Sequence, residues 1–591
     1  MPIHATIPPM RPESIRPNKW QVAPQVPETL QQEFSHVNPI VLQVLYNRGI
    51  IDPARVQAFL EKRYLEPTDP FLLTDMDKAV ARIEQAIENE ENIVVYGDFD
   101  ADGVTSTVLL TQALRGLGMM TRQVRPYIPS RVDEGYGLNP EALTKIKEEF
   151  EANLVITVDC GIRSVAEVVH ANEIGLEMII TDHHSLGPEM PPATAVINPK
   201  RPESQYPETM LAGVGIAYKL AQALCQAMPE RVAFEQADLL DLVAIGTVAD
   251  LAPLLGENRI LVAEGLEILN NAHRPGVKSL AKIARLKPGQ MSAESIAFGL
   301  GPRINAAGRL AHAYDAARLL AVNNSIQADQ FATQLDQLNR ERQRITADLS
   351  AKAEAMVAPD APIIIAADPD FVSGVVGLVA SRLADIHYRP AIVIEKGEEE
   401  SRGSCRSIPE FHVTEALDEV ADLLVRHGGH AQAAGFTVTN DNLDTFITRM
   451  TEIAEEKLKD LALYPTITID AEIELTEIDW ALYESLSPLE PTGYANPTPV
   501  FMSRNVEVRS HRVVGQDGTH LQMHLSGGKQ EDHYQEMASI AFRQGAWASH
   551  LPQYIDIVYT VNVNEWRGRR TLQLMIQDIQ ATEMETAVIQ S

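Results

Sequence analysis

The hydrophobic positions of this chain change their period several times, and each change predicts a different kind of secondary structure. Apolar residues first recur at Val80, Ile83 and Ile87, which is the spacing of one face of a helix. Short apolar runs typical of strands then occupy 93–96 and 154–158, with helical patterns between them. Alternation of strands and helices predicts a doubly wound α/β domain with a parallel sheet.

Several helix starts can also be placed from the sequence. Asp52-Pro53 and Asn139-Pro140 each put proline at the first helical position, where its missing N–H costs nothing. Residues 211–325 have mostly helical patterns and would complete the first α/β domain. Residues 327–356 contain neither proline nor glycine and predict one long helix that joins two lobes. An ordinary surface helix of the first lobe is the alternative for that segment.

The C-terminal half predicts a second α/β lobe and then an all-β region. Apolar strands are expected at 362–367 and 391–394, with a helix after Ser373. From about residue 465 short alternating stretches are separated by glycine turns, which predicts a small β-barrel. The predicted division is an N-terminal helical extension at 1–75, a first α/β lobe at 76–325, a connecting helix at 326–358, a second lobe at 359–460, a barrel at 465–582 and a tail at 583–591.

Composition places the chain among folded proteins of several domains. It has 591 residues, of which 45% are hydrophobic and 22% charged. No apolar run approaches the ~18 residues that span a membrane, and the N-terminus lacks the apolar core of a signal peptide. Cys160, Cys225 and Cys405 lie far apart without zinc or disulfide spacing, which favours a reducing cytoplasm.

The formal net charge of −31 argues at first against a nucleic-acid partner, because phosphates are repelled by a negative surface. Local clusters oppose that conclusion. Residues 121–131 contain three arginines and no acid, and Trp566 is followed by Arg567, Arg569 and Arg570. Any one cluster could be an ordinary solvated face. A nucleic acid would therefore bind in basic grooves on an otherwise acidic body.

Three predicted strands end in carboxylates or histidines. Asp98, Asp100 and Asp102 follow the first strand, Asp159 follows the second, and Asp182-His183-His184 follows a third apolar run. Because the carboxyl ends of parallel strands share one crevice, these side chains are expected to converge there. Clustered acids repel one another, so a shared cation is the expected counter-charge. Two such cations can hydrolyse phosphodiesters with little other help.

Each of these positions also has a structural alternative. The Asp98–Asp102 run could cap the next helix, and Asp159 could be a helix N-cap. Asp250 follows an apolar helical run, where a carboxylate at a helix C-terminus is unfavourable without compensation. Imidazole ligands beside carboxylates suit Mn²⁺ better than calcium. A common metal site explains all of these positions together, whereas the alternatives need a separate reason for each.

Together with further motifs, these residues resemble the RecJ family, the single-strand-specific exonucleases of the DHH phosphoesterase superfamily. The similarity spans roughly residues 40 to 580. The motifs that carry it are Gly97–Gly103, Ile128–Arg131 with Glu134–Asn139, Val158–Gly161, Asp182–His184, Leu211–Gly215, Gly246–Asp250, Gly301–Arg309, Gly428–Phe436, and Asn564–Trp566 with Leu572–Leu574.

The resemblance implies a metal site and a fold. The fold would be two α/β lobes, DHH and DHH-associated, joined by a long helix and followed by an OB-type β-barrel. Two divalent cations, Mn²⁺ or Mg²⁺, would be the cofactors. Asp159 would bridge them, His184 would approach the scissile phosphate, and Asp102 and Asp182 would support the ligands from behind. The implied metal ligands are Asp98, Asp100, Asp159, His183 and Asp250.

The resemblance also implies a substrate and partners. The reaction would be 5′→3′ digestion of single-stranded DNA to 5′-mononucleotides in DNA repair and recombination. A helicase and a single-strand-binding protein would be partners, and no membrane would be involved. The implied nucleic-acid contacts are Arg131, Arg303, Asn305, Arg309, Ser373, Gly374, Arg406, Gly429, His430 and Trp566.

Two other functions compete with this one. A phosphodiesterase of the same superfamily could act on short oligonucleotides or cyclic dinucleotides, but a small substrate needs neither the barrel nor the long helix. A non-catalytic single-strand-binding scaffold for replication would be expected to lack metal ligands, and the ligand set here is intact. One position departs from some relatives, which have histidine where this chain has Tyr96. A phenol is a poor neutral ligand, which leaves the coordination number open.

Overall fold

The computed structural model describes residues 12, 15–131, 134–135, 137–271, 273–515, 517–527 and 535–582. The predicted tail at 583–591 lies outside the described residues. The chain forms two compact units. One comprises Glu66–Leu463 with Gly493–Ala495, and the other comprises the described residues of Met1–Leu65, Tyr464–Thr492 and Asn496–Ser591. Nowhere in these described ranges is there a helix both long and apolar enough to cross a membrane.

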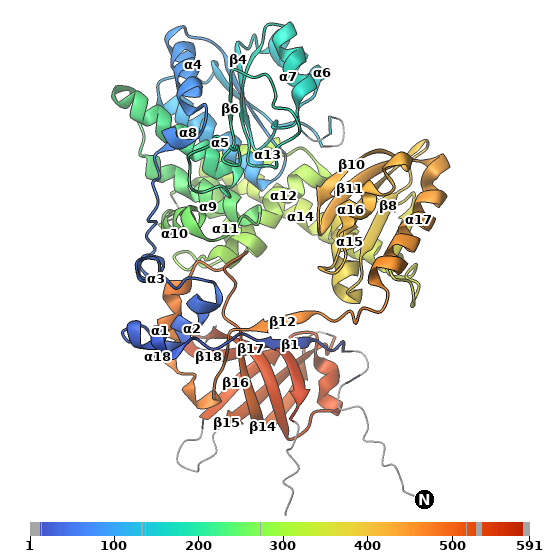
Figure 1. Ribbon diagram of the computed structural model, residues 1–591. Helices are drawn as coiled ribbons and strands as arrows, with labels where there is room; N and C mark the ends of the chain where they lie inside the picture. The colour runs from blue at the N-terminus through green and yellow to red at the C-terminus, as the bar shows by residue number, and fades with distance from the viewer. Residues whose placement is uncertain are drawn as a thin grey trace, which may run out of the picture. The chain divides into compact units, whose positions relative to one another are not determined.

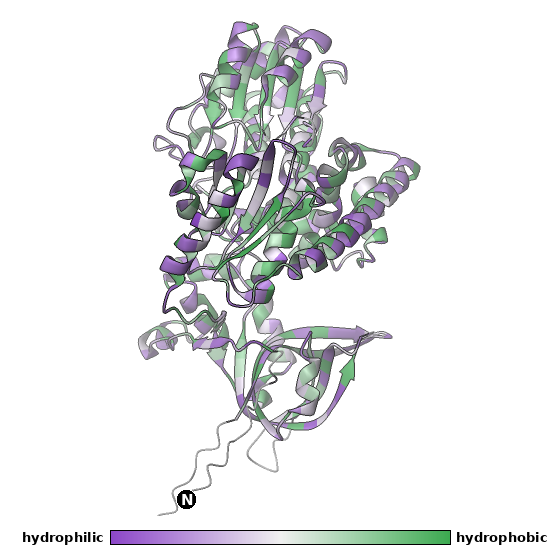
Figure 2. Ribbon diagram, turned by 90° about the vertical axis from the view of Figure 1, so that its right-hand side faces the viewer, coloured by the Kyte–Doolittle hydropathy of each residue, from purple (hydrophilic) through white to green (hydrophobic). Residues whose placement is uncertain are grey.

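The first lobe is built on a five-stranded parallel sheet, of which Figure 1 labels β4 and β6. The strand order is β3-β2-β4-β5-β6. Its central strands are continuous apolar runs because helices cover both faces. Hydrophobic residues run through these strands, as the colouring of Figure 2 shows. The strands are β2 (Ile93–Gly97), β3 (Val124–Tyr127), β4 (Leu154–Val158), β5 (Glu177–Thr181) and β6 (Ala195–Ile197).

Two hydrophobic clusters pack on opposite faces of this sheet. Val95 and Ile156 belong to the larger cluster with α4, α5 and α8, whereas Val94 and Val155 pack with α6 and α7. This is the doubly wound arrangement that the alternating pattern predicted. The helices of this lobe are α4 (Met76–Glu88), α5 (Ala101–Gly116), α6 (Pro140–Glu149), α7 (Val165–Glu173), α8 (Gly213–Ala227), α9 (Leu240–Ala249), α10 (Gly256–Asn271), α11 (Pro275–Ile283), the π-helix η4 (Ser295–Leu300), α12 (Gly301–Leu310) and α13 (Tyr314–Ala321).

A single helix, α14 (Ser325–Glu354), connects the two lobes, as the sequence predicted. It begins where the Asn324 side chain accepts hydrogen bonds from the amides of Ile326 and Gln327. Its first half packs on α11, α12 and α13, and it also contacts α15 (Ser373–His387) of the second lobe. The helix therefore belongs to the packing of both lobes.

The second lobe has a five-stranded sheet in the order β10-β11-β9-β8-β7. Only β7 and β8 are parallel, and the other neighbours are antiparallel. The antiparallel part contains the glycine-rich motif Gly428–Phe436. The elements are β7 (Ile364–Asp368), β8 (Ala391–Glu395), β9 (Glu400–Arg406), α16 (Val413–Asp418), β10 (Leu424–His430), β11 (Ala433–Thr439) and α17 (Asn440–Leu458).

The other unit contains a closed β-barrel, which the spacing of short strands and turns predicted. The strand order is β13-β14-β15-β16-β18-β17, and β14 also pairs with β17 to close the barrel. The pattern analysis did not find β16. The strands are β13 (Ala471–Glu472), β14 (Phe501–Val514), β15 (His520–Gly527), β16 (Gln535–Ala541), β17 (Tyr554–Trp566) and β18 (Arg569–Ala581).

The N-terminal segment of this unit contains a strand that the helical pattern did not predict. β1 (Lys19–Val22) pairs in parallel with β12 (Thr466–Ile469), which directly precedes the barrel. The indole N–H of Trp20 donates to Asp578 Oδ2 on β18. The short helices α1 (Glu28–Glu33), α2 (Pro39–Asn47) and α3 (Pro53–Leu60) follow, and Asp52 caps α3 as expected from Asp52-Pro53.

Candidate metal centre

The register of the parallel sheet explains why acidic residues from distant segments converge. Gly97 is paired with Val158, and Val158 is paired with Thr181, so β2, β4 and β5 end side by side. The next residue along each strand is Asp98, Asp159 or Asp182. Sequence alternation therefore predicted the correct edge of the sheet, and the in-line register places the three carboxylates at one level.

The Asp98–Asp102 segment does not continue the extended conformation of β2, which ends at Gly97. Asp100 is the N-cap of α5, and its Oδ1 accepts hydrogen bonds from the amides of Asp102 and Gly103. Helix capping by this segment, which was the alternative to a metal site, is therefore observed, and Asp100 also belongs to a group of possible metal ligands. A Cβ on Gly103 would lie 2.6 Å from the Asp98 nitrogen, so this tight turn requires glycine.

Asp159 adopts a left-handed conformation with φ of 63°, so it is not a helix N-cap. Its side chain is 2% exposed and lies against the N-terminus of α8. A Cβ on Gly213 would lie 2.7 Å from the Asp159 Cβ, so that glycine leaves the space for the carboxylate. The strained backbone at Asp159 is the kind that clusters at functional sites.

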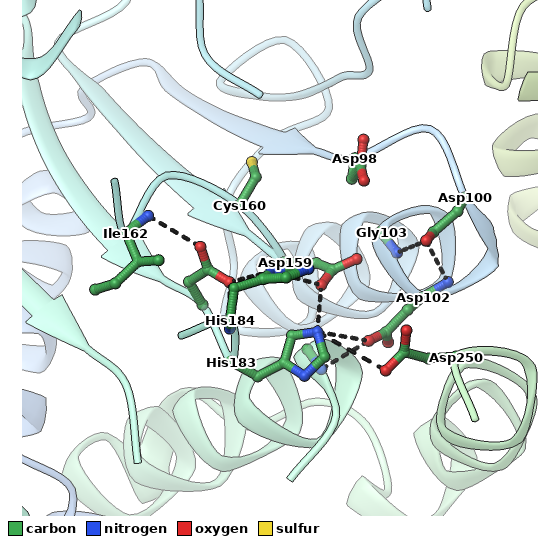
Figure 3. A network of polar contacts seen from close by, with 12 residues as sticks. Asp98, Asp100, Asp102, Gly103, Asp159, Cys160, Ile162, His183, His184 and Asp250 are labelled. Atoms are coloured by element: carbon green, nitrogen blue, oxygen red, sulfur yellow. Dashed lines mark hydrogen bonds and ion pairs between the residues drawn. The ribbon is translucent and has the colours of Figure 1, made fainter. Parts of the chain in front are cut away.

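The two histidines differ in what holds them. Asp182 Oδ1 accepts hydrogen bonds from the His184 amide at 3.0 Å and from its Nδ1 at 2.7 Å, and Oδ2 accepts from the Ile162 amide. This contact places the proton of His184 on Nδ1 and fixes the ring. The His183 carbonyl accepts a hydrogen bond from the Lys200 ammonium. The ring of His183 faces the carboxylates instead, as Figure 3 shows.

The His183 Nε2 atom is the point at which the carboxylates meet (Figure 3). It lies 3.0 Å from Asp159 Oδ1, 3.8 Å from Asp250 Oδ2 and 3.9 Å from Asp102 Oδ2. Asp102 is less available than the others because its two oxygens accept hydrogen bonds from the Gly213 and Val214 amides. Asp102 thereby fixes the N-terminus of α8, which agrees with a supporting position behind the ligands.

Three overlapping groups of side chains have the arrangement of a metal site. Their donor atoms lie within 4.8 Å of one another in each group, and Asp159 and His183 each belong to two groups. The groups are Asp98 with Asp100 and Asp159, Asp159 with His183 and His184, and Asp102 with His183 and Asp250. These carboxylate and imidazole donors suit Mn²⁺ or Mg²⁺.

Two buried atoms at the centre of these groups test whether a cation fits. Asp159 Oδ1 and His183 Nε2 are both buried, and although they lie 3.0 Å apart, neither makes a hydrogen bond. Burying an acceptor and a ring nitrogen unsatisfied is unfavourable, whereas a cation would bond to both. The donor set and these two atoms therefore fit a divalent cation.

The pKa values at this site are perturbed in the directions expected of acids crowded together in a buried position. Burial, followed by repulsion from neighbouring aspartates, raises the pKa values of Asp98 and Asp159 well above the ordinary range. The same causes raise the pKa of Asp102 to about 7 and that of Asp250 to about 9. Burial also lowers the pKa of His183 to about 3, which keeps its nitrogen available as a ligand.

The Asp182–His184 pair shows the opposite behaviour. Burial alone would raise the pKa of Asp182 and lower that of His184. Their mutual hydrogen bond and charge attraction outweigh burial, so the pKa of Asp182 is lowered and that of His184 is raised. Of the two neighbouring histidines, His183 and His184, it is thus His184 that can carry a proton.

Helix α12 supports the metal centre from outside the sheet. Asn305 Oδ1 accepts a hydrogen bond of 2.7 Å from the amide of Ala101, which lies between Asp100 and Asp102. A Cβ on Gly308 would lie 2.3 Å from the Phe99 carbonyl oxygen, so the helix and the loop are in backbone contact. The structure therefore gives Asn305 a positioning contact, and its predicted contact with nucleic acid stays a prediction.

A group of arginines lies beside the acidic loop. Burial, and then repulsion from Arg131, Arg342 and Arg406, lowers the pKa of Arg309 to about 10. The Arg131 guanidinium stacks over the Phe99 ring at 4.9 Å, and attraction to Asp98 and Asp100 partly offsets the lowering of its pKa by burial. Four cations that repel one another in a partly buried position favour an anionic ligand.

This group spans both lobes of the larger unit. Arg309 Nη1 donates to the Gly374 carbonyl, and a Cβ on Gly374 would lie 2.4 Å from the Arg309 carbonyl oxygen. Arg406 donates to Ser404 Oγ and to the Cys405 carbonyl. Arg342, on α14, has a buried Nε without a hydrogen-bond partner. Its helix carries an arginine-rich stretch, but the sequence did not indicate which of its arginines faces inward.

Other predicted contacts lie elsewhere. Arg303 pairs with Asp336 at 2.9 Å and donates to the Gly299 carbonyl, so its guanidinium is largely engaged within the protein. Ser373 opens α15, and Gly429 and His430 end the β10 strand. Trp566 is 69% exposed at the end of β17, so it is not a packing residue of the barrel.

Tyr96 leaves the metal centre altogether. It points to the opposite face of the sheet, where it is fully buried and its hydroxyl donates to the Gly137 carbonyl. Burial raises the pKa of the Tyr96 phenol well above its ordinary value. The phenol therefore takes no part in coordination.

Lys200, which the sequence did not single out, lies near Asp182 and Asp250, and burial lowers its pKa.

Comparisons with known proteins agree with this architecture. Residues 92–247 match the DHH family N-terminal domain, residues 360–456 the DHHA1 domain and residues 469–578 the RecJ OB domain. The single-stranded-DNA-specific exonuclease RecJ of Bacillus subtilis is 38% identical over 98% of this chain and 71% of its own length. That of Dickeya dadantii is 35% identical over 93% of this chain and 98% of its own.

Solved structures give the same result. The crystal structure of RecJ with Mn²⁺ from Thermus thermophilus superimposes with a TM-score of 0.81 at 29% identity, over 96% of this chain and 80% of that one. Its Mg²⁺ complex gives a TM-score of 0.76. Fold and site together define a DHH-type protein with an added OB barrel. Given the near full-length similarity, the chain belongs to the RecJ family.

Proposed function

We propose that this chain is a single-strand-specific DNA exonuclease that hydrolyses phosphodiester bonds from the 5′ end and releases 5′-mononucleotides. The observation that carries the proposal is the convergence of Asp98, Asp159, His183 and Asp250. At its centre Asp159 Oδ1 and His183 Nε2 are buried without a hydrogen bond. The names of the RecJ relatives support the substrate and the class of reaction.

The proposed metal ligands are Asp98, Asp100, Asp159, His183 and Asp250, with Asp159 shared between two divalent cations. Mn²⁺ or Mg²⁺ at these positions would supply Lewis acidity, which lowers the pKa of a bound water and offsets charge on the phosphate. Asp182 holds the His184 ring through Nδ1, and a protonated His184 would donate its other N–H to the scissile phosphate.

The arginines would bind the substrate backbone. Arg131, Arg309 and Arg406, together with Arg342, form a positive group beside the acidic loop on a chain of net charge −31. A DNA phosphate among them would replace their mutual repulsion by attraction. Ser373, Gly374, Gly429 and His430 of the second lobe and Trp566 of the barrel remain further candidates for contacts with the strand, Trp566 by stacking.

The test is cleavage of a single strand labelled at either end, in Mn²⁺, Mg²⁺ or EDTA. We expect the 5′-label to appear at once as a mononucleotide with either metal, and the 3′-labelled strand to shorten progressively. EDTA and the Asp159→Ala variant should abolish cleavage. Binding without cleavage in every condition would overturn the proposal and favour a scaffold, and rapid release of a 3′-labelled mononucleotide would reverse the polarity.

The proposal also extends to cellular context. An exonuclease restricted to single strands needs the duplex opened first, so a helicase and a single-strand-binding protein are the proposed partners in repair and recombination. A reducing cytoplasm suits the three cysteines, all buried and none in a disulfide. We expect duplex DNA to be degraded only when a helicase is added. Equal degradation without one would contradict this expectation.

A further inference from the structure

Phe298 is a solvent-exposed aromatic residue in a segment that packs on α9, the helix that ends before the proposed metal ligand Asp250. Its exposure of 77% is the greatest among the large hydrophobic side chains that the structure describes as exposed. It lies in η4, a segment of π-helix that runs directly into α12. π-Helical segments are rare and frequently occur at functional sites. A single exposed hydrophobic residue is common on a protein surface, and it is the location of Phe298 that sets it apart.

The position of Phe298 is fixed by the packing of η4 and α12 on α9. A Cβ on Gly301 would lie 3.2 Å from the Cβ of Ala249, the residue before Asp250. Phe298 comes three residues before Gly301, within one turn of the π-helical segment. On the other side of Asp250, Leu251 is 65% exposed and has a left-handed φ of 60°. Two exposed apolar side chains therefore belong to the segments on either side of one proposed metal ligand.

The opposite end of the same helical segment has the complementary chemistry. Arg309 near the end of α12 lies in the group with Arg131, Arg342 and Arg406. The continuous segment from η4 to α12 thus presents an aromatic ring at one end and guanidinium groups at the other. A ligand with flat apolar faces along a polyanionic backbone matches both ends. Single-stranded DNA has this chemistry, whereas inorganic phosphate lacks the apolar faces and a duplex keeps its bases stacked inside.

We propose that Phe298, together with Leu251 in the segment after Asp250, binds the nucleobase of the nucleotide whose phosphate occupies the metal centre. The inference rests on the proposed function and adds the contact that holds the terminal nucleotide. Stacking on an aromatic ring tolerates every base because each has a π-face. The contact would therefore favour unpaired DNA without selecting a sequence.

The experiment compares two substrates and three variants in the full chain. One strand has an ordinary 5′-terminal nucleotide and the other an abasic residue there. Phe298→Ala should lower kcat/KM on the ordinary strand about 5- to 150-fold, the range for one lost base stack. On the abasic strand the same substitution should change kcat/KM little, because the stacking partner is already absent. Phe298→Trp should retain the preference for the ordinary strand.

Ile326→Ala is the matched control, because Ile326 is 70% exposed but lies at the start of α14. It should behave as wild type on both strands. An equal loss on ordinary and abasic strands in Phe298→Ala would overturn the inference in favour of a structural role, and so would wild-type kinetics. A wild-type protein that cleaves neither strand would instead overturn the proposed function, and the inference with it.

Discussion

Asn305 is the residue whose structural role differs most from its sequence-based one. The resemblance suggested a contact with DNA, whereas its side chain holds the Ala101 amide in the turn between Asp100 and Asp102. Residues that orient ligands from behind typically change metal affinity about 10- to 100-fold when they are mutated. Asn305 is therefore expected to act on metal binding.

We predict that Asn305→Ala weakens Mn²⁺ binding about tenfold or more, measured by calorimetric titration. Asn324→Ala is a matched control, because Asn324 makes a similar side-chain cap at the start of α14, away from the acidic loop. The control should lose comparable thermal stability and keep its Mn²⁺ affinity. Equal Mn²⁺ affinities in wild type and Asn305→Ala would remove the positioning role.

The part of the candidate site that lies at strand ends could be predicted from the sequence. Asp98, Asp159 and Asp182 each follow an apolar strand, and parallel topology brings strand ends together. The contact of Asn305 with Ala101 could not be predicted, because it joins residues 204 positions apart through side-chain packing. The engagement of Arg303 with Asp336 was missed for the same reason.

At the scale of elements, α8 and α12 determine the shape of the site through glycines. Gly213 at the start of α8 leaves room for Asp159, and Gly308 on α12 allows contact with the Phe99 carbonyl. Gly215 lies two residues further along α8, where a Cβ would meet its nearest atom, on Leu211, at 3.4 Å. Only the first two positions require glycine for the site.

We predict that Gly213→Ala lowers cleavage about 100-fold or more, because the added methyl group would displace the Asp159 carboxylate, and a small misplacement can cost that much. Gly215→Ala should retain activity and gain about 0.5–1 kcal/mol in stability from the higher helix propensity of alanine. For both variants, cleavage is measured as an initial rate and stability by thermal unfolding. Normal activity in Gly213→Ala would show that this contact does not fix Asp159.

The α12–α14 contact permits a test of Arg303, for which DNA binding was predicted from the family. Asp336 pairs with Arg303 and also with Arg340. If Arg303 also grips a phosphate, Arg303→Ala should weaken binding and reduce the slope of log K against log salt by about 0.7. Asp336→Ala, which frees the guanidinium, should keep that slope. Equal stability losses with unchanged slopes would leave Arg303 a purely structural residue.

Some elements were predictable from local pattern and others were not. The long helix α14 follows from a segment without proline or glycine, and Asn139 caps α6 as expected. Helix α5 begins at Ala101 because the Asp100 side chain caps it, which an apolar pattern does not reveal. β1 was missed because its partner strand β12 lies far along the chain, with Lys19 paired to Thr466.

At the scale of the whole molecule, the metal-free centre should make stability depend on pH. In the unfolded chain Asp102 and Asp250 would ionise near 3.8, whereas the folded pKa values are about 7 and about 9. Between these values the folded state binds more protons than the unfolded state. The free energy of unfolding of the metal-free protein should therefore fall as pH rises from about 4 to about 9.

We predict that Mn²⁺ raises the midpoint of thermal unfolding more at about pH 8 than at about pH 5, because it stabilises carboxylates that are ionised at the higher pH. Asp250→Asn, which removes one of the titrating groups, should flatten the dependence in EDTA. The measurement is thermal unfolding in EDTA and in Mn²⁺ at both values. An equal Mn²⁺ effect at the two pH values would contradict the assignment.

The central claim is that side chains from β2, β4, β5 and α9 hold a pair of divalent cations. Anomalous diffraction at the manganese edge from a crystal soaked in Mn²⁺ tests it most directly. We predict two adjacent peaks, both in contact with Asp159, with Asp98 and Asp100 at one and His183 and Asp250 at the other. A single peak remote from Asp159, or none among these residues, would contradict the account.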